Sequence, residues 1–157
     1  LRVTEGTMEG RFRTGAIEGM LSVLYEVSTE SDRMGIRLIG DRVFHKDGAD
    51  ILSGGIEPGA VQVPGSGNPI ILMVDRQTTG GYAKAFSVIS ADRAKLGQLR
   101  PGDRIRFSRI ALEEAHDAFL ELEESIGDSI SPDVERSRYF SVKVNGRTYA
   151  VEVEEVL

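Results

Sequence analysis

Residues 65–82 read GSGNPIILMVDRQTTGGY, and this stretch decides both the fold and the site. A turn of glycine, asparagine and proline leads into five apolar residues, 70–74, which are too few for a core helix and favour a buried strand. Five hydrogen-bonding side chains follow at once, and paired glycines close the block. A surface turn needs only one or two such residues, so the block predicts a binding site, with a polar hairpin loop as the alternative.

The pattern around this stretch is that of a β-protein. The chain has 18 glycines, and before residue 111 its short apolar runs are separated by glycine and proline turns, which is typical of an antiparallel β-barrel or sandwich. Strands are expected at residues 1–5, 22–27, 35–39, 60–63, 70–74, 83–89 and 104–110. A helix capped by Thr14 should reach Leu21. A second, short helix capped by Ser90 or Asp92 should end near Leu96. Residues 40–55 are expected to be mostly loop.

The C-terminal third has a different pattern. Apolar residues recur at helical spacing over residues 112–126, and acidic residues cover the other side, which predicts an amphipathic helix packed on the barrel. The apolar positions are Leu112, Ala115, Phe119, Leu122 and Ile126. Residues 128–137 are typical of a linker. Alternating runs around Asn145 and Gly146 then predict a β-hairpin within residues 138–157, so residues 1–127 form the main domain.

Composition limits the classes of function. The 157 residues suit one domain, or one domain and a piece of another. With no cysteine, disulfides and thiolate chemistry are excluded. Acidic residues outnumber basic ones, 25 to 19, which argues against a nucleic-acid partner. No apolar run is long enough for a membrane span and no signal peptide is visible, so a cytoplasmic location without a membrane partner is expected. A start at Leu1 predicts a piece of a longer protein.

The polar block and its neighbours supply the candidate catalytic residues. Asp75 and Arg76 would point to opposite faces of a strand, and Lys84 would share a face with Tyr82 and could hold a carboxylate or stabilise an enolate-like oxygen. A solvated strand lysine is the alternative for Lys84. Candidate substrate-binding residues with neutral hydrogen-bonding groups or a close backbone approach are Gln77, Thr78, Thr79, Gly80, Gly81 and Tyr82.

A second polar cluster, Ser31, Asp32 and Arg33, could bind a substrate oxygen through the arginine fork, or it could be an ordinary surface turn. His45 lies in a polar loop and is a candidate general acid or base, with surface decoration as the alternative. His45 and His116 lack ligand spacing, so no metal site is expected.

Five segments together carry a family resemblance: residues 65–82, SVISAD at 87–92, QLRPGD at 98–103, SDRMG at 31–35 and HKDGAD at 45–50. Over about residues 1–124 the chain resembles the urea amidolyase-related family, also called allophanate hydrolase subunit 2, the C-subunit of 5-oxoprolinase or biotin-dependent carboxyltransferase. The resemblance implies a mainly β fold, a cyclophilin-like antiparallel β-barrel with one or two packing helices. This chain would be the C-terminal barrel of two. The tail hairpin finishes the main domain or is similar to the start of a truncated biotinyl carrier domain.

The resemblance also implies a function. In this family, carboxybiotin on a carrier domain delivers CO2 to a small amide such as urea. This chain would bind no cofactor itself. Its implied partners are the biotinyl carrier domain, a subunit like allophanate hydrolase subunit 1, and the missing N-terminal half. One alternative is the C-subunit of an ATP-dependent 5-oxoprolinase, with ATP used elsewhere in the complex. Another is a non-enzymatic partner-binding module. The isolated chain is expected to be inactive.

Overall fold

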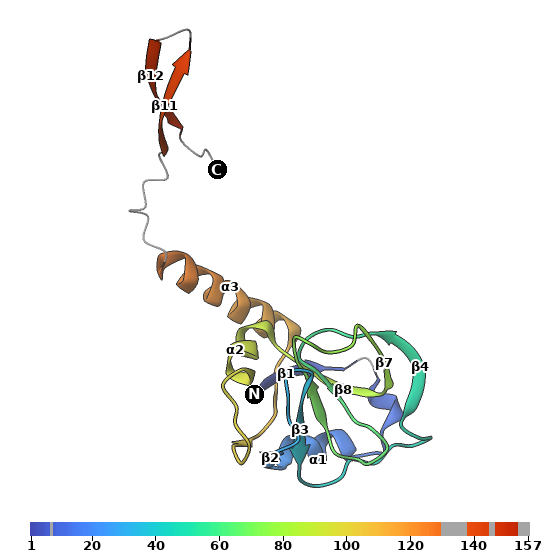
Figure 1. Cartoon of the computed structure of the whole chain (residues 1–157). Coiled ribbons are helices and arrows are strands. Elements are labelled where there is room, and N and C mark those ends of the chain that lie inside the picture. Colours follow the sequence, from blue (N-terminus) through green and yellow to red (C-terminus); the bar gives the residue numbers. More distant parts are fainter. Residues whose placement is uncertain (7, 130–137, 145–146, 154–157) are drawn as a thin grey trace. The chain divides into compact units, whose positions relative to one another are not determined.

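A computed structural model describes residues 1–6, 8–129, 138–144 and 147–153 (Figure 1). The chain divides into two compact units, Leu1–Leu122 and Glu123–Leu157. Within the described residues no helix combines the length and apolar character that a membrane crossing requires.

The largest sheet of the first unit has eight strands, in the order β10-β1-β8-β5-β6-β3-β2-β9. Its neighbouring strands are antiparallel except for the parallel pair β1 and β10. In this order the strands are β10 (Ser108–Arg109), β1 (Arg2–Glu5), β8 (Lys84–Val88), β5 (Ala60–Gln62), β6 (Ile70–Leu72), β3 (Gly35–Ile39), β2 (Tyr25–Val27) and β9 (Arg104–Ile105).

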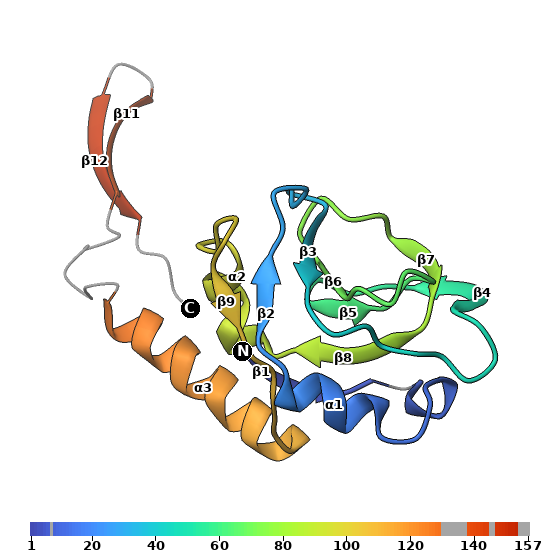
Figure 2. The same ribbon diagram turned by 90° about the horizontal axis from the view of Figure 1, so that it is seen from below.

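The two edges of this sheet are close together because only Arg106 and Phe107 separate β9 from β10. A link of that length spans about 10 Å, so the sheet has to curl (Figure 2). Phe107 is fully buried at the junction, with ring centroids 5.9 Å from Tyr25 and 5.6 Å from Phe86. Burying each such ring stabilises the fold by about 1.5–3 kcal/mol. The expected mainly β, barrel-like fold is confirmed.

Helices cover part of the curled sheet. Helix α1 (Ala16–Ser22), which follows the 3-10 turn η1 (Glu9–Arg11), buries Ile17 and Met20. It begins one residue later than predicted: Gly15 occupies the N-cap at φ 78°, and Thr14 makes no cap. The 3-10 turn η2 (Ser90–Asp92) and helix α2 (Arg93–Leu96) follow β8 as expected, but no side-chain cap hydrogen bond forms at either. The carboxylate of Asp92 binds Arg2 and Lys95 instead.

Several predicted strand boundaries were wrong. Strand β4 (Asp50–Gly55) lies within the expected loop, because β7 (Thr79–Tyr82) supplies its backbone partners in a separate two-stranded ribbon. Strand β6 ends at Leu72, and Val74 is 68 % exposed, so residues 70–74 are not a fully buried strand. The expected strands at 22–27 and 104–110 are shorter, and the second is divided into β9 and β10.

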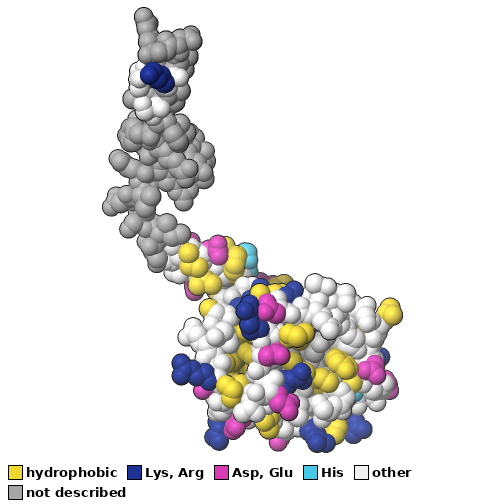
Figure 3. Space-filling view, in the orientation of Figure 1, with side chains coloured by type: hydrophobic (Ala, Val, Ile, Leu, Met, Phe, Trp, Pro, Cys, Tyr) yellow, Lys and Arg dark blue, Asp and Glu magenta, His cyan; other side chains and the backbone are white. Residues whose placement is uncertain are grey.

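Helix α3 (Leu112–Ser129) confirms the predicted helix but not its predicted apolar contact. Ala118 is buried, whereas Leu112 remains 71 % exposed and Phe119 and Ile126 are also exposed. Apolar side chains are visible along this helix in Figure 3. The helical periodicity therefore identified the element correctly, but the stripe it predicted as buried is largely open to solvent.

The tail contains the predicted hairpin. Strands β11 (Arg138–Val144) and β12 (Arg147–Val153) are antiparallel, and Val144 pairs with Arg147 at the closed end. Asn145 and Gly146, which were expected to form the turn, lie outside the described residues, as do residues 130–137 of the expected linker. Residues 128 and 129 of that linker belong to α3.

Candidate functional site

A cavity of about 250 Å³ opens beside strands β3, β6 and β7. Its walls come together because β3 pairs with β6 (Gly35 opposite Leu72) and β6 with β5 (Ile70 opposite Gln62). The ribbon strand β7 completes the wall. The lining residues are Asp32, Met34, Gly35, Arg37, Ile56, Gln62, Ile70, Leu72, Arg76, Gln77, Thr79, Gly80, Gly81 and Tyr82.

The turn after β6 holds the polar block against the cavity. Arg76 donates from Nε to the Ile56 carbonyl (3.1 Å) and from Nη1 to the Val74 carbonyl (3.4 Å), which fixes the half-buried guanidinium in the wall. Asp75 and Arg76 lie in this turn and not on a strand, so the expectation of opposite strand faces was wrong. Of the predicted block, Asp75 and Thr78 lie outside the lining.

The two predicted polar clusters meet at the rim. Arg33 forms an ion pair with Asp75 (Nε to Oδ2, 2.8 Å), with the two side chains 82 % and 47 % exposed. Asp32 shapes the turn before β3: its Oδ1 accepts hydrogen bonds from the backbone N–H groups of Met34 (2.8 Å) and Gly35 (3.0 Å). Ser31 lies outside the lining, and its hydroxyl accepts a bond from the Arg37 N–H (3.0 Å).

Two polar lining residues were not anticipated. Arg37 projects from β3, and its guanidinium has no hydrogen-bond or ion-pair partner in the part of the chain described. Gln62 on β5 is 6 % exposed and donates from Nε2 to the Tyr82 carbonyl (3.2 Å). The only sequence signal for either was a polar residue within an apolar strand, which strands commonly contain on their solvent face.

Gly80 is required at this site for space. A Cβ there would overlap Ile56 Cδ1 and lie 2.9 Å from Gln62 Nε2. Gly80 and Gly81 do not have positive φ, so the backbone angle does not require a glycine at either position, and the expected close approach accounts for Gly80. What approaches Gly80 is the side chain of Gln62.

Lys84 and His45 lie outside the lining. Lys84 Nζ pairs with Glu57 Oε2 (3.0 Å), and Ser87 donates to Glu57 Oε1 (2.6 Å). Burial raises the pKa of Glu57, but the hydrogen bonds from Ser87 and Lys84 outweigh it and lower that pKa below its usual value. His45 packs on Phe12 (centroids 5.1 Å apart), and its Nε2 is buried without a hydrogen-bond partner among the described residues. Among the described residues no group of three carboxylates or histidines could hold a metal ion.

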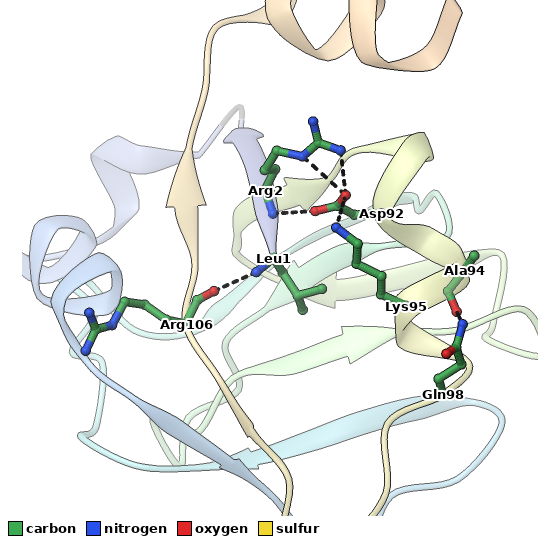
Figure 4. Close-up of polar contacts among 7 residues, drawn as sticks. All are labelled: Leu1, Arg2, Asp92, Ala94, Lys95, Gln98 and Arg106. Atoms are coloured by element: carbon green, nitrogen blue, oxygen red, sulfur yellow. Dashed lines mark hydrogen bonds and ion pairs between the residues drawn. The ribbon is translucent and has the colours of Figure 1, made fainter. Parts of the chain in front are cut away.

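A separate polar cluster, which we call the Asp92 cluster, lies where β1 meets α2 (Figure 4). Asp92 is 1 % exposed and accepts from the Arg2 N–H (2.8 Å), from Arg2 Nη2 (2.7 Å) and from Lys95 Nζ (2.8 Å). Burial alone raises the pKa of this carboxyl, but the hydrogen bonds from Arg2 and Lys95 outweigh it and hold the pKa well below its usual range. This cluster joins strand β1 to helix α2, which is far away in the sequence. None of its three residues, Arg2, Asp92 and Lys95, lines the cavity.

The first unit is thus a curled, mostly antiparallel sheet with a small cavity whose lining includes Arg37, Arg76 and Gln62. Residues 1–109 match the family described as carboxyltransferase domain, subdomain A and B, and the chain belongs to this family. The resemblance drawn from the sequence motifs is thereby confirmed.

Individual relatives agree with this assignment. The chain is 48 % identical over 91 residues to the C-subunit of 5-oxoprolinase from Haemophilus influenzae, a match that covers 58 % of this chain and 29 % of the relative. It is 32 % identical over 128 residues to urea amidolyase of Lachancea kluyveri, and this match covers 70 % of this chain and 7 % of the relative. The crystal structure of K. lactis urea amidolyase superposes with a TM-score of 0.76 at 26 % sequence identity. The superposition covers 82 % of this chain and 8 % of the amidolyase chain. The chain thus spans about three-tenths of the 5-oxoprolinase relative and far less of the urea enzymes.

Proposed function

We propose that this chain supplies an amide-binding pocket to a larger enzyme. The observation that carries the proposal is that Arg37, Arg76 and Gln62 line one cavity. Guanidinium groups bind carboxylate and carbonyl oxygens, and a carboxamide offers both a donor and an acceptor. The cavity of about 250 Å³ lies below the range of roughly 300–1,000 Å³ found for drug-sized ligands, which favours a small molecule.

The charges around the cavity favour a ligand that carries a carboxylate. Arg37 and Arg76 bring two positive charges, and Asp32 brings one negative charge whose Oδ1 already accepts two backbone hydrogen bonds. 5-Oxoproline is a cyclic amide with a carboxylate, whereas urea is neutral. Together with the 48 % identity to a 5-oxoprolinase component, this makes the opening of a cyclic amide our preferred activity for the whole protein.

In this proposal the residues of the chain bind and orient the substrate. Arg76, anchored to the Ile56 carbonyl, and Arg37, which has no partner in the described part of the chain, hold the carboxylate and the amide oxygen. Positioning of this kind can supply a large part of a rate enhancement, and fixed positive groups stabilise negative charge that develops on oxygen. ATP and the remaining catalytic groups would be provided by other parts of the complex.

Carboxyl transfer to urea is the second candidate. It is favoured by the likeness to urea amidolyases. The hairpin of β11 and β12 is compatible with the carrier-domain start that the sequence led us to expect. Carboxybiotin, when delivered by such a carrier, would supply the carboxyl group. The guanidinium groups of Arg37 and Arg76 fit a carboxylate of this kind, and this chain would hold no biotin of its own.

The test is an activity assay of the longer protein with its neighbouring subunits, comparing 5-oxoproline with ATP against urea with carboxybiotin. We expect turnover of 5-oxoproline, and a fall in kcat/KM of about tenfold or more in Arg37→Ala. Arg100→Ala is the matched control, because Arg100 is exposed in a turn and is absent from the cavity lining. Turnover of urea alone would favour the second candidate. Turnover of neither substrate would favour a non-enzymatic binding module.

The chain of 157 residues alone should show little or no turnover. Preorganised groups act together, and a small misplacement of one can cost about 100-fold. Restoring the rest of the relatives' length should therefore restore activity. Full activity from residues 1–157 by themselves would contradict this expectation.

A further inference from the structure

Gln62 is an unusual residue for its place in the fold. It lies on β5, between β6 and β8 in the middle of the sheet, and only 6 % of it is exposed. A buried carboxamide is costly unless its groups are hydrogen-bonded. One face of the residue lines the cavity. Packing alone therefore does not explain why a glutamine occupies this buried position.

The hydrogen bond to Tyr82 fixes the orientation of the carboxamide. The Tyr82 carbonyl can only accept, so the group 3.2 Å from it must be the Gln62 nitrogen. The carboxamide oxygen is then left on the other side, and no residue in the described part of the chain donates a hydrogen bond to it. The oxygen is therefore available as an acceptor for a molecule in the cavity.

The surroundings hold this orientation. Gly80 leaves the space that the Gln62 Nε2 occupies, since a Cβ at position 80 would lie 2.9 Å from that atom. On the sheet side, the backbone of Gln62 pairs with Ile70 and Lys84 in the neighbouring strands. The acceptor is thus preorganised before any ligand enters, which lowers the entropic cost of binding.

We propose that Gln62 determines specificity by accepting a hydrogen bond from an N–H group of the bound ligand, so that the cavity selects an amide over an ester or lactone of the same shape. This inference rests on the proposed amide-binding function. Arg37 and Arg76 can donate to ligand oxygens but cannot accept. Gln62 supplies the complementary acceptor from the buried side of the cavity, and a ligand with oxygen in place of N–H leaves it unpaired.

The test compares 5-oxoproline with the lactone in which oxygen replaces the ring N–H, using calorimetric titration of the full chain. The wild type should bind the lactam at least about tenfold more tightly, because a buried acceptor without its donor is costly. In Gln62→Met, which keeps the length but not the amide, the ratio should fall to about one. Arg76→Ala is the control: it should weaken both ligands by a similar factor and leave the ratio unchanged.

A measurement without substitution covers the case in which Gln62→Met fails to fold. In the labelled wild type, the NMR resonance of the Gln62 carboxamide carbon should shift on addition of 5-oxoproline but not of the lactone. Urea, which also carries N–H, is a third probe. A Gln62 shift with urea and not with 5-oxoproline would support the role of Gln62 while moving the substrate to urea.

Equal binding of lactam and lactone by the wild type, or an unchanged ratio in Gln62→Met, would overturn the inference and leave the pocket intact. Binding of 5-oxoproline with no shift of the Gln62 resonance would also overturn the role of Gln62, without contradicting the amide-binding pocket. Binding of none of the three probes would overturn both the proposed ligand class and the role of Gln62.

Discussion

The Asp92 cluster and the cavity wall both contain polar side chains, but the hydrogen bonds of these side chains differ. At Asp92, which is almost fully buried, the carboxylate oxygens accept bonds from Arg2 and Lys95, and the groups satisfy one another. In the cavity, Arg37 has no partner in the described part of the chain, and Gln62 uses only its nitrogen.

This difference separates polar residues that stabilise the fold from those that can bind a ligand. Buried polar groups in folded proteins are nearly always hydrogen-bonded. An acceptor that faces a cavity instead remains free to bind a ligand. Buried, mutually satisfied groups such as those at Asp92 connect distant parts of the chain. The comparison predicts that substitutions in the Asp92 cluster change stability, whereas those in the wall change binding.

The largest effect should come from Asp92→Ala. It removes a buried carboxylate and leaves the Arg2 N–H without its acceptor, so the free energy of unfolding should fall by about 3 kcal/mol. Guanidinium chloride denaturation measures this. Asp75→Ala removes a carboxylate from an exposed ion pair with Arg33 and should cost less than about 1 kcal/mol. Equal losses in the two variants would contradict the distinction between a buried, mutually satisfied polar cluster and an exposed ion pair at the rim of the cavity.

Acidification should weaken the same cluster more gently, because a protonated carboxyl keeps part of its hydrogen bonding. Since the pKa of Asp92 is lower in the folded state, its stabilising contribution is complete above the ordinary aspartate pKa of about 3.9 and is lost as pH falls toward the lowered value. Glu57, whose pKa is also lowered, should contribute in the same direction. Denaturation from pH 6 to pH 2 should therefore show a shallower decline in Asp92→Asn than in the wild type. If the free energy of unfolding depended on pH equally in the two proteins, Asp92 would not be a source of the pH dependence.

Gly80→Ala should affect both the stability of the fold and the binding of ligand. The added Cβ meets Ile56 and Gln62, two side chains that can move only within a packed wall, so we expect a loss of about 1–2 kcal/mol in the free energy of unfolding. Displacing Gln62 should also reduce the preference for lactam over lactone. Gly97→Ala is the matched control: Gly97 has φ −66° and its added Cβ would have 3.7 Å to the nearest atom. That variant should be neutral or slightly more stable. A neutral Gly80→Ala would show that the wall is not packed as described.

Arg37→Ala should have the smallest effect on stability, below about 0.5 kcal/mol, because its exposed guanidinium has no partner in the described part of the chain. Its affinity for 5-oxoproline should nevertheless fall about tenfold, or about 1.4 kcal/mol. Calorimetric titration and thermal unfolding of the same sample separate the two quantities. A large loss of stability with unchanged affinity would place Arg37 with the structural residues.

The sequence alone determined features that are encoded within a few neighbouring residues. Helical spacing identified α3, the Asn-Gly pair identified the tail hairpin, and the short apolar runs identified most strands of the sheet. The polar block after β6 was also recognisable, and Arg76, Gln77 and Tyr82 lie along the cavity. Such patterns depend on local geometry and turn chemistry, which do not require knowledge of distant contacts.

Only the tertiary structure decided which polar groups meet. Lys84 pairs with Glu57, Arg33 with Asp75, and β4 is a strand because β7 pairs with it. Gln62 reaches the cavity because β5 lies beside β6, and Gly80 makes room for it from a ribbon 18 residues further along the chain. Strand pairing and register set these contacts, and a shift of one residue would turn every side chain to the other face. The local sequence does not specify such pairings, because each depends on segments that the curled sheet brings together.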